Sequence, residues 1–215
     1  MKKDTRKIAA AGMLCALTYV VMAVGRVPVV LFLKYDPSDI IVTLGGLIWG
    51  PMMAFAVSAA VAVIEMLTAS DTGVLGCIMN IVQTVSFACT AAAIYQKRRT
   101  LGGAVAGLLT GCAAMVTVMM LWNYFLTPLY MGYPREAVAE LLLPAFLPFN
   151  LLKAGLNASV TFLLYKPVVT ALRKSGLVPA AGSRRAQGRP AGLLLAAALA
   201  AATCLLFLLS WNSLI

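Results

Sequence analysis

Residues 102–127 read GGAVAGLLTGCAAMVTVMMLWNYFLT, an uncharged run that is long enough to cross a membrane as one helix. Spanning about 30 Å of hydrocarbon takes roughly 20 apolar residues, at about 1.5 Å of helical rise each. Working outward from this run, comparable segments bounded by charged residues, glycine or proline occupy 8–24, 38–49, 52–69, 72–95 and 144–173. The sequence therefore predicts an all-α integral membrane protein with a bundle of six helices.

The composition of the chain excludes several classes of protein. Of the 215 residues, 62% are hydrophobic and only 11% are charged, which excludes a soluble protein. The net charge of +10 lies in short clusters between apolar runs, so we expect a lipid bilayer and no nucleic acid as its partner. The chain has no histidine, no P-loop motif and no C-x-x-C spacing among its five cysteines. Glu65 is the only carboxylate that we expect inside the membrane, so neither an enzyme nor a metal site is predicted.

Basic residues indicate how the helices are oriented. Thirteen of the 17 lysines and arginines lie at the N-terminus, at 97–99 and at 166–189. The loops at the other ends of the helices hold only Arg26, Lys34 and Arg135. The positive-inside rule then predicts a multi-pass protein of the cell membrane whose N-terminus is cytoplasmic.

The chain divides into three predicted parts. Residues 1–175 form the membrane domain, and residues 176–190 form a cytoplasmic linker rich in Gly, Pro, Ala and Arg. Residues 191–215 contain an uncharged run that predicts a seventh transmembrane helix. The alternative for this last run is a tail lying in the membrane interface.

Polar side chains collect in the outer half of the predicted bundle. Asn123 lies about one turn from the outer end of its helix, and Asn150 and Lys153 lie roughly 9 and 14 Å inside theirs. Three further polar side chains at outer positions are Asp39, Glu65 and Asn80. Because such groups are costly inside a membrane, their shared depth predicts a ligand-binding cavity that opens outward. The alternatives are asparagines that hydrogen-bond helix to helix and a lysine that snorkels to the interface.

The side chains in this group suggest the kind of ligand. Asparagine offers donors and an acceptor and lysine offers donors, which suits a ligand edge that alternates carbonyl and N–H groups. Tyr124 and Phe149 are their sequence neighbours and supply flat faces for a ring. We therefore expect a planar heteroaromatic ligand. Two other classes of protein fit less well. An intramembrane enzyme would lack a histidine for its chemistry, and a structural scaffold would not explain why the polar side chains lie at one depth in the membrane.

Several strings then resemble one known family. They are LKYDPSDI at 33–40, the Gly45-Gly46 and Gly50-Pro51 pairs, NYFLTPLY at 123–130 and PFNLLK at 148–153. In this order and spacing they resemble the riboflavin-specific substrate-binding subunit, or S component, of energy-coupling factor (ECF) vitamin transporters. The resemblance covers about residues 5–174, and the predicted seventh helix has no counterpart in it.

The resemblance implies a six-helix S-component bundle with an outward-facing flavin pocket, capped by the loop between the first two helices. The family's ring contacts carry over to Asn123, Asn150 and Lys153. Riboflavin is then the transported substrate and not a cofactor; FMN, or another small ring compound, is the alternative ligand.

The resemblance also implies partner proteins. The family docks on a transmembrane coupling subunit, itself carried by two cytoplasmic ATPases, through small residues of the first helix. Ala9, Gly12 and Ala16 form such a stripe here, spaced i, i+3 and i+7. The alternative is packing of this stripe within the chain.

Overall fold

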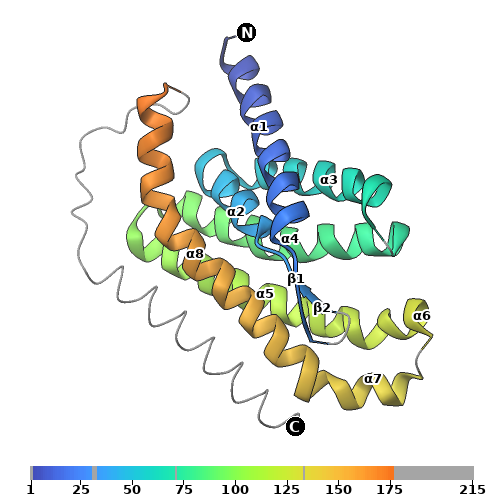
Figure 1. Ribbon diagram of the computed structural model, residues 1–215. Coiled ribbons are helices and arrows are strands. Elements are labelled where there is room, and N and C mark those ends of the chain that lie inside the picture. The colour runs from blue at the N-terminus through green and yellow to red at the C-terminus, as the bar shows by residue number, and fades with distance from the viewer. Residues whose placement is uncertain (1, 31–32, 71, 133, 177–215) are drawn as a thin grey trace.

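The computed structural model describes residues 2–30, 33–70, 72–132 and 134–176. Within these residues, five helices are long and apolar enough to cross a membrane, and the shorter α2 completes a bundle of six. The predicted all-α membrane fold is thereby confirmed, whereas the predicted seventh helix lies outside the described residues. In chain order the elements are α1 (Lys2–Gly25), β1 (Val27–Val30), β2 (Leu33–Tyr35), α2 (Ser38–Trp49), α3 (Pro51–Thr68), α4 (Gly73–Lys97), α5 (Leu101–Phe125), α6 (Thr127–Met131), α7 (Arg135–Leu141), the π-helix η1 (Leu142–Phe146) and α8 (Leu147–Lys174) (Figure 1).

The break between α2 and α3 has a local cause. Gly50 has a φ of 111°, a backbone conformation that favours glycine, and Pro51 begins α3 where its missing N–H costs least. A Cβ at Gly50 would lie 2.6 Å from Nε2 of Gln96 on α4. The turn therefore packs against the end of α4, and α2 stays too short to cross a membrane alone.

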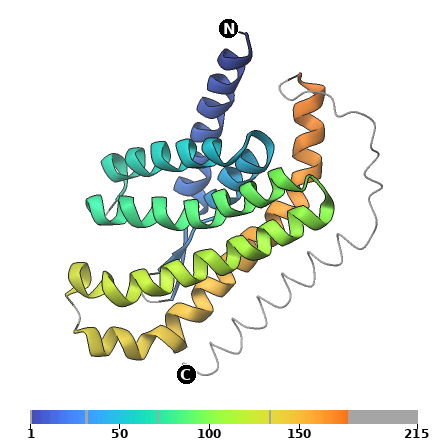
Figure 2. The ribbon, with the colours of Figure 1, turned by 180° about the vertical axis from the view of Figure 1, so that it is seen from behind.

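Helices α4 and α5 pack against each other near the turn that joins them and diverge towards their other ends (Figures 1 and 2). Small residues permit their close approach, since Gly107 and Gly111 of α5 face the backbone of α4. A Cβ added to Gly107 would lie 2.6 Å from the carbonyl oxygen of Ala91, and one added to Gly111 would lie 2.7 Å from that of Phe87. Phe87 and Ala91 are completely buried, so this contact is part of the bundle core.

The chain between α1 and α2 forms a β-hairpin that the sequence analysis did not predict. Strands β1 and β2 pair antiparallel, with Val27 opposite Tyr35. The Tyr35 hydroxyl donates to Oδ1 of Asn157 on α8 at 3.0 Å, which ties the hairpin to the helix. Figures 1 and 2 show the hairpin passing from the end of α1 towards the α5 and α8 pair.

The chain before α8 is also more structured than predicted. The sequence predicts that this helix begins at Pro144, whereas in the structure α7 and one π-helical turn precede α8. Pro144 lies within the π-helix and Pro148 in the first turn of α8. Because proline lacks an N–H group, an irregular turn at this position loses less backbone hydrogen bonding than it would elsewhere.

Candidate functional site

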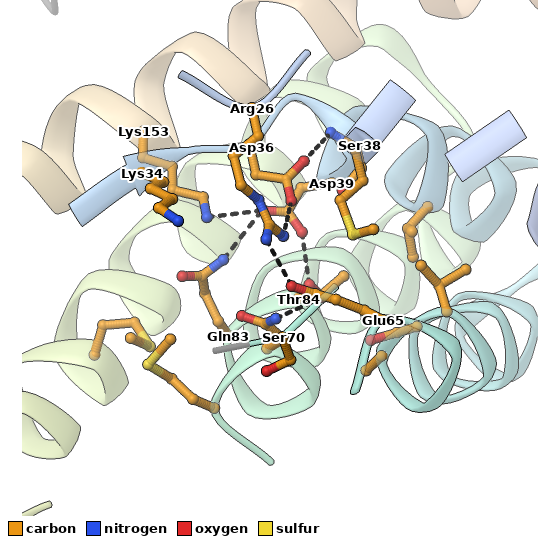
Figure 3. Close-up of a pocket in the computed structure, with 18 of the residues that line it drawn as sticks. Arg26, Lys34, Asp36, Ser38, Asp39, Glu65, Ser70, Gln83, Thr84 and Lys153 are labelled. Carbon is orange, nitrogen blue, oxygen red and sulfur yellow. Dashed lines mark hydrogen bonds and ion pairs between the residues drawn. The ribbon is translucent and has the colours of Figure 1, made fainter. Parts of the chain in front are cut away.

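A cavity of about 310 Å³ lies among α1, α2, α3, α4, α5 and α8, next to the hairpin. This volume falls within the size range of small-molecule sites. Charged and polar side chains from several of these helices converge on it (Figure 3). Seven of the eight predicted ligand-binding residues line it: Asp39, Glu65, Asn80, Asn123, Phe149, Asn150 and Lys153.

The α5 and α8 side of the cavity carries two buried amides. Asn123 is 2% exposed, and its Oδ1 accepts a hydrogen bond from the Thr127 hydroxyl at 3.0 Å. Its Nδ2 has no hydrogen-bond partner among the described residues. Asn150 is 1% exposed and donates through Nδ2 to the carbonyl oxygen of Phe146 at 2.8 Å, which fixes the plane of its amide. The amides can thus offer a donor from Asn123 and an acceptor from Asn150.

Phe149 and Lys153 complete this side of the cavity. Both are 5% exposed, and both project from the first two turns of α8. The ammonium of Lys153 lies 3.6 Å from the Asp39 carboxylate. A flat apolar ring, an ammonium and two amides together match a planar ligand with polar atoms along one edge.

Asp39 is a second carboxylate inside the bundle, which corrects the expectation that Glu65 would be the only one. Asp39 is 4% exposed in the first turn of α2, where its side chain contacts α4 and α8. Each carboxylate pairs with a different cation, Asp39 with Lys153 and Glu65 with Arg26. This arrangement differs from an acid–base dyad, in which two carboxylates share one proton.

Arg26 lines the cavity beside the hairpin, and this position is not predicted from the sequence. Its guanidinium binds Asp36 at 2.9 Å and Glu65 at 2.7 Å. Asn80 donates to the other oxygen of Glu65 at 2.7 Å. Charged groups from the residue that follows α1, from α3 and from the segment before α2 are therefore linked at this side of the cavity, with α4 in support (Figure 3). No motif marks Arg26 in the sequence, because its partners lie 10 and 39 residues further along the chain.

The pKa of Asp36 lies below its ordinary value. Burial raises this pKa, but the charge of Lys153 and hydrogen bonds from Ser38 and Arg26 lower it by more. A depressed pKa in the folded state means that the carboxylate stabilises the fold above its unfolded-state pKa. That contribution is lost only as the pH falls through the lower folded-state value. The Arg26–Asp36 ion pair is consequently intact at neutral pH.

Thr18 of α1 is a cavity residue that the sequence analysis missed. It is 1% exposed, and its hydroxyl has no partner among the described residues. Helical hydroxyls elsewhere, such as those of Thr43 and Ser86, bond back to the carbonyl four residues earlier. Ser58 of α3 lines the same cavity. These two hydroxyls give the α1 and α3 side groups that both donate and accept hydrogen bonds.

Tyr124 does not line the cavity, unlike the other predicted ligand-binding residues. Its side chain is 41% exposed and packs edge to face against Phe125, with ring centroids 4.9 Å apart. Successive helical residues point about 100° apart, so Asn123 faces the cavity while Tyr124 faces outward.

The stripe of Ala9, Gly12 and Ala16 lies on an exposed face of α1. A Cβ added to Gly12 would meet nothing within 4 Å. Among the described residues, Gly12 therefore does not pack against another part of the chain, which was the alternative to a docking surface. The stripe faces away from the bundle and leaves a smooth surface there.

A bundle of apolar helices around a buried polar cavity defines a multi-pass membrane protein built to hold a small polar solute. Residues 6–165 match the model of the family described as ECF transporter, substrate-specific component, and the chain belongs to this family. The fold agrees with a solved structure, the S component of a bacterial ECF transporter, with a TM-score of 0.68 and 24% identity. That match covers 79% of this chain and 99% of the solved one.

Two curated relatives resemble the chain in sequence. The riboflavin transporter FmnP of Bacillus subtilis (strain 168) is 31% identical over an alignment of 142 positions, which covers 62% of this chain and 74% of the relative. The riboflavin transporter RibU of Staphylococcus aureus (strain TCH60) is 26% identical over an alignment of 181 positions, which covers 80% of this chain and 95% of the relative.

Proposed function

We propose that this protein captures riboflavin, or a related flavin, from outside the cell and delivers it through an ECF-type, ATP-driven transporter. The observation that carries the proposal is the buried group of Asn123, Asn150 and Lys153 beside Phe149. The flavin ring system is flat and alternates carbonyl and N–H groups along one edge, which matches these donors and acceptors. The names of the two curated relatives support the same ligand. The flavin is then a transported substrate and not a cofactor, and the protein is not an enzyme.

The test of this proposal is direct binding. Purified protein should quench riboflavin fluorescence with a saturable, stoichiometric titration, and protein purified from flavin-replete cells should be yellow. Other small heteroaromatic vitamins and their precursors should compete poorly. Tight binding of one of those compounds, with no response to riboflavin, would instead favour an S component for a different ligand. A protein that binds none of them favours a membrane role outside transport.

The proposed orientation places the N-terminus in the cytoplasm and the mouth of the cavity outside. It is supported by the basic residues Lys97, Arg98, Arg99, Lys166 and Lys174 at helix ends. The N-terminal end of α1 and the C-terminal end of α8 also lie at the same end of the molecule in both views (Figures 1 and 2).

The proposed partners are an ECF transmembrane coupling subunit and, through it, two cytoplasmic ATPase subunits. Ala9, Gly12 and Ala16 offer the coupling subunit a smooth face on α1, where a partner helix can approach closely. The chain carries no P-loop motif of its own, so the proposal assigns ATP hydrolysis to other polypeptides.

Substitution of Gly12 by leucine should separate riboflavin binding from complex formation. A bulky side chain on the exposed stripe blocks a partner helix but touches nothing in this chain. Riboflavin affinity should therefore stay unchanged, while co-purification with the coupling subunit should be lost. Gly102→Leu is the matched control, because Gly102 is also exposed with open space around it. If the Gly12→Leu protein assembles normally, α1 does not dock through this stripe.

In the proposed domain division, residues 191–215 form a separate transmembrane helix. We therefore expect that riboflavin binding does not require them. The cavity is lined by residues between Thr18 and Lys153. Truncation after Ser175 should therefore leave the riboflavin dissociation constant unchanged. A cysteine added after Ile215 should react with an impermeant thiol reagent from outside the cell. Weaker binding by the truncated protein would mean that this segment contributes to the cavity.

A further inference from the structure

The Asp39 carboxylate has four polar partners among the described residues. Its Oδ1 accepts a hydrogen bond from Thr84 at 2.6 Å. Its Oδ2 accepts from Gln83 at 3.2 Å and from Asn157 at 3.3 Å, and the Lys153 ammonium lies 3.6 Å from the same oxygen. One side chain of α2 therefore connects to both α4 and α8 (Figure 3).

These contacts leave the Asp39 carboxylate and the Lys153 ammonium with different capacities to hydrogen-bond a ligand. The carboxylate already faces three neutral donors and one cation, so little acceptor capacity remains for a ligand. An ammonium has three N–H donors, and the ion pair with Asp39 at 3.6 Å takes at most one of them. Lys153 can thus face Asp39 and a ligand at the same time, whereas the oxygens of Asp39 border the cavity but are already occupied by protein donors.

The surroundings of Asp39 also fix where Lys153 points. Thr84 and Gln83 hold the carboxylate from α4, which is a different helix from the one that carries Lys153. A charge held from α4 therefore limits the positions that the flexible lysine side chain on α8 can take. The negative charge also offsets the cost of keeping the ammonium 5% exposed inside the bundle.

We infer that Asp39 is a positioning residue and not a ligand-binding residue: it neutralises the Lys153 ammonium and directs it at the bound flavin. This inference rests on the proposed function, in which Lys153 contacts the ring. It differs from the sequence prediction, which grouped Asp39 with the residues that touch the ligand.

A double-mutant cycle tests the inference through riboflavin dissociation constants. Asp39→Asn keeps the size of the side chain and removes its charge. If Asp39 acts through Lys153, this substitution should weaken binding by about tenfold or more in the otherwise unchanged protein. In a Lys153→Met protein the same substitution should change binding by less than about threefold, because the group that Asp39 positions is gone. An equal loss in both backgrounds, or no loss in either, would overturn the inference.

Glu65→Gln provides the matched control within the same cavity. Glu65 is also a buried, ion-paired carboxylate, but its partners are Arg26 and Asn80. Its effect on binding should therefore be the same with Lys153 or with Met at that position. The absorption spectrum of bound riboflavin adds a second measurement, since loss of a positioned ammonium changes the bands of the ring. Asp39→Asn should shift those bands towards the spectrum of the Lys153→Met protein, and an unshifted spectrum would contradict the inference.

If the Asp39→Asn protein does not fold, the folding yield of a double variant tests the inference instead. Removing one member of a buried pair leaves an uncompensated charge, whereas removing both does not. The Asp39→Asn, Lys153→Met double variant should then recover a folded, monodisperse protein, and its failure to do so would show that Asp39 acts independently of Lys153. Failure of the proposed function is recognised separately, because the unchanged protein would then not bind riboflavin at all.

Discussion

Riboflavin should bind at least about tenfold more weakly once Asn123 is replaced by aspartate. The substitution keeps the size of the side chain and the oxygen that accepts from Thr127, but it exchanges the unpartnered Nδ2 donor for a second oxygen. A ring carbonyl that Nδ2 would have bound then faces an acceptor in a buried site. A lost hydrogen bond of this kind costs about 1–3 kcal/mol, and the repulsion of two oxygens adds to it.

Fluorescence quenching titrations measure this effect directly. Thr117→Ser is a suitable control, since Thr117 lies on the same helix and is exposed. Asn150→Ala should weaken binding in the same direction, because it removes the amide that Phe146 holds in place. Unchanged dissociation constants in both the Asn123→Asp and Asn150→Ala proteins would remove the basis for the proposed site.

Alanine at Gly107 should lower the thermal stability of the protein markedly. The added methyl group would lie 2.6 Å from the Ala91 carbonyl oxygen, which belongs to the backbone of α4 and cannot rotate away. Helices α4 and α5 must then separate, and overpacking of a core typically costs about 1–3 kcal/mol. Thermal unfolding in detergent, followed by loss of the monodisperse peak, measures the shift.

Gly12→Ala is the matched control for this substitution, because it adds the same methyl group where nothing lies within 4 Å. Its unfolding temperature should equal or exceed that of the unchanged protein, since alanine is the better helix former. Similar unfolding temperatures for the Gly107→Ala and Gly12→Ala proteins would mean that α4 and α5 do not rely on this close approach.

The helices of this protein could be predicted from sequence because their limits are marked locally. The predicted segment 38–49 coincides with α2, since Pro37 precedes it and Gly50 and Pro51 end it. The hairpin at 27–35 could not be found in this way. It is a short apolar segment beside a long helix, and it is held by the distant contact between Tyr35 and Asn157.

The level of the candidate site residues in the membrane could be predicted from the sequence, but the direction in which each side chain points could not. Counting residues along a helix gives the level of a side chain in the membrane, and this placed Asn123, Asn150 and Lys153 together. It does not say which face of the helix a residue occupies, so Tyr124, the sequence neighbour of Asn123, is predicted at the cavity although it points outward. The hydrogen-bond partners of Asp39 could not be predicted either, because Thr84 and Asn157 lie 45 and 118 residues away in the chain.

The position of α1 has a thermodynamic consequence. One face of this helix carries the exposed stripe of Ala9, Gly12 and Ala16, while Thr18 and Met22 of the same helix line the cavity. A rigid helix cannot tilt or rotate at one face without moving the other. If a protein seated on the stripe changes the affinity for the solute by some factor, the solute must change the affinity for that protein by the same factor. Binding of the solute and binding of the partner protein are then reciprocally coupled. A binding isotherm recorded on the isolated chain therefore describes only the affinity for the solute in the absence of the partner.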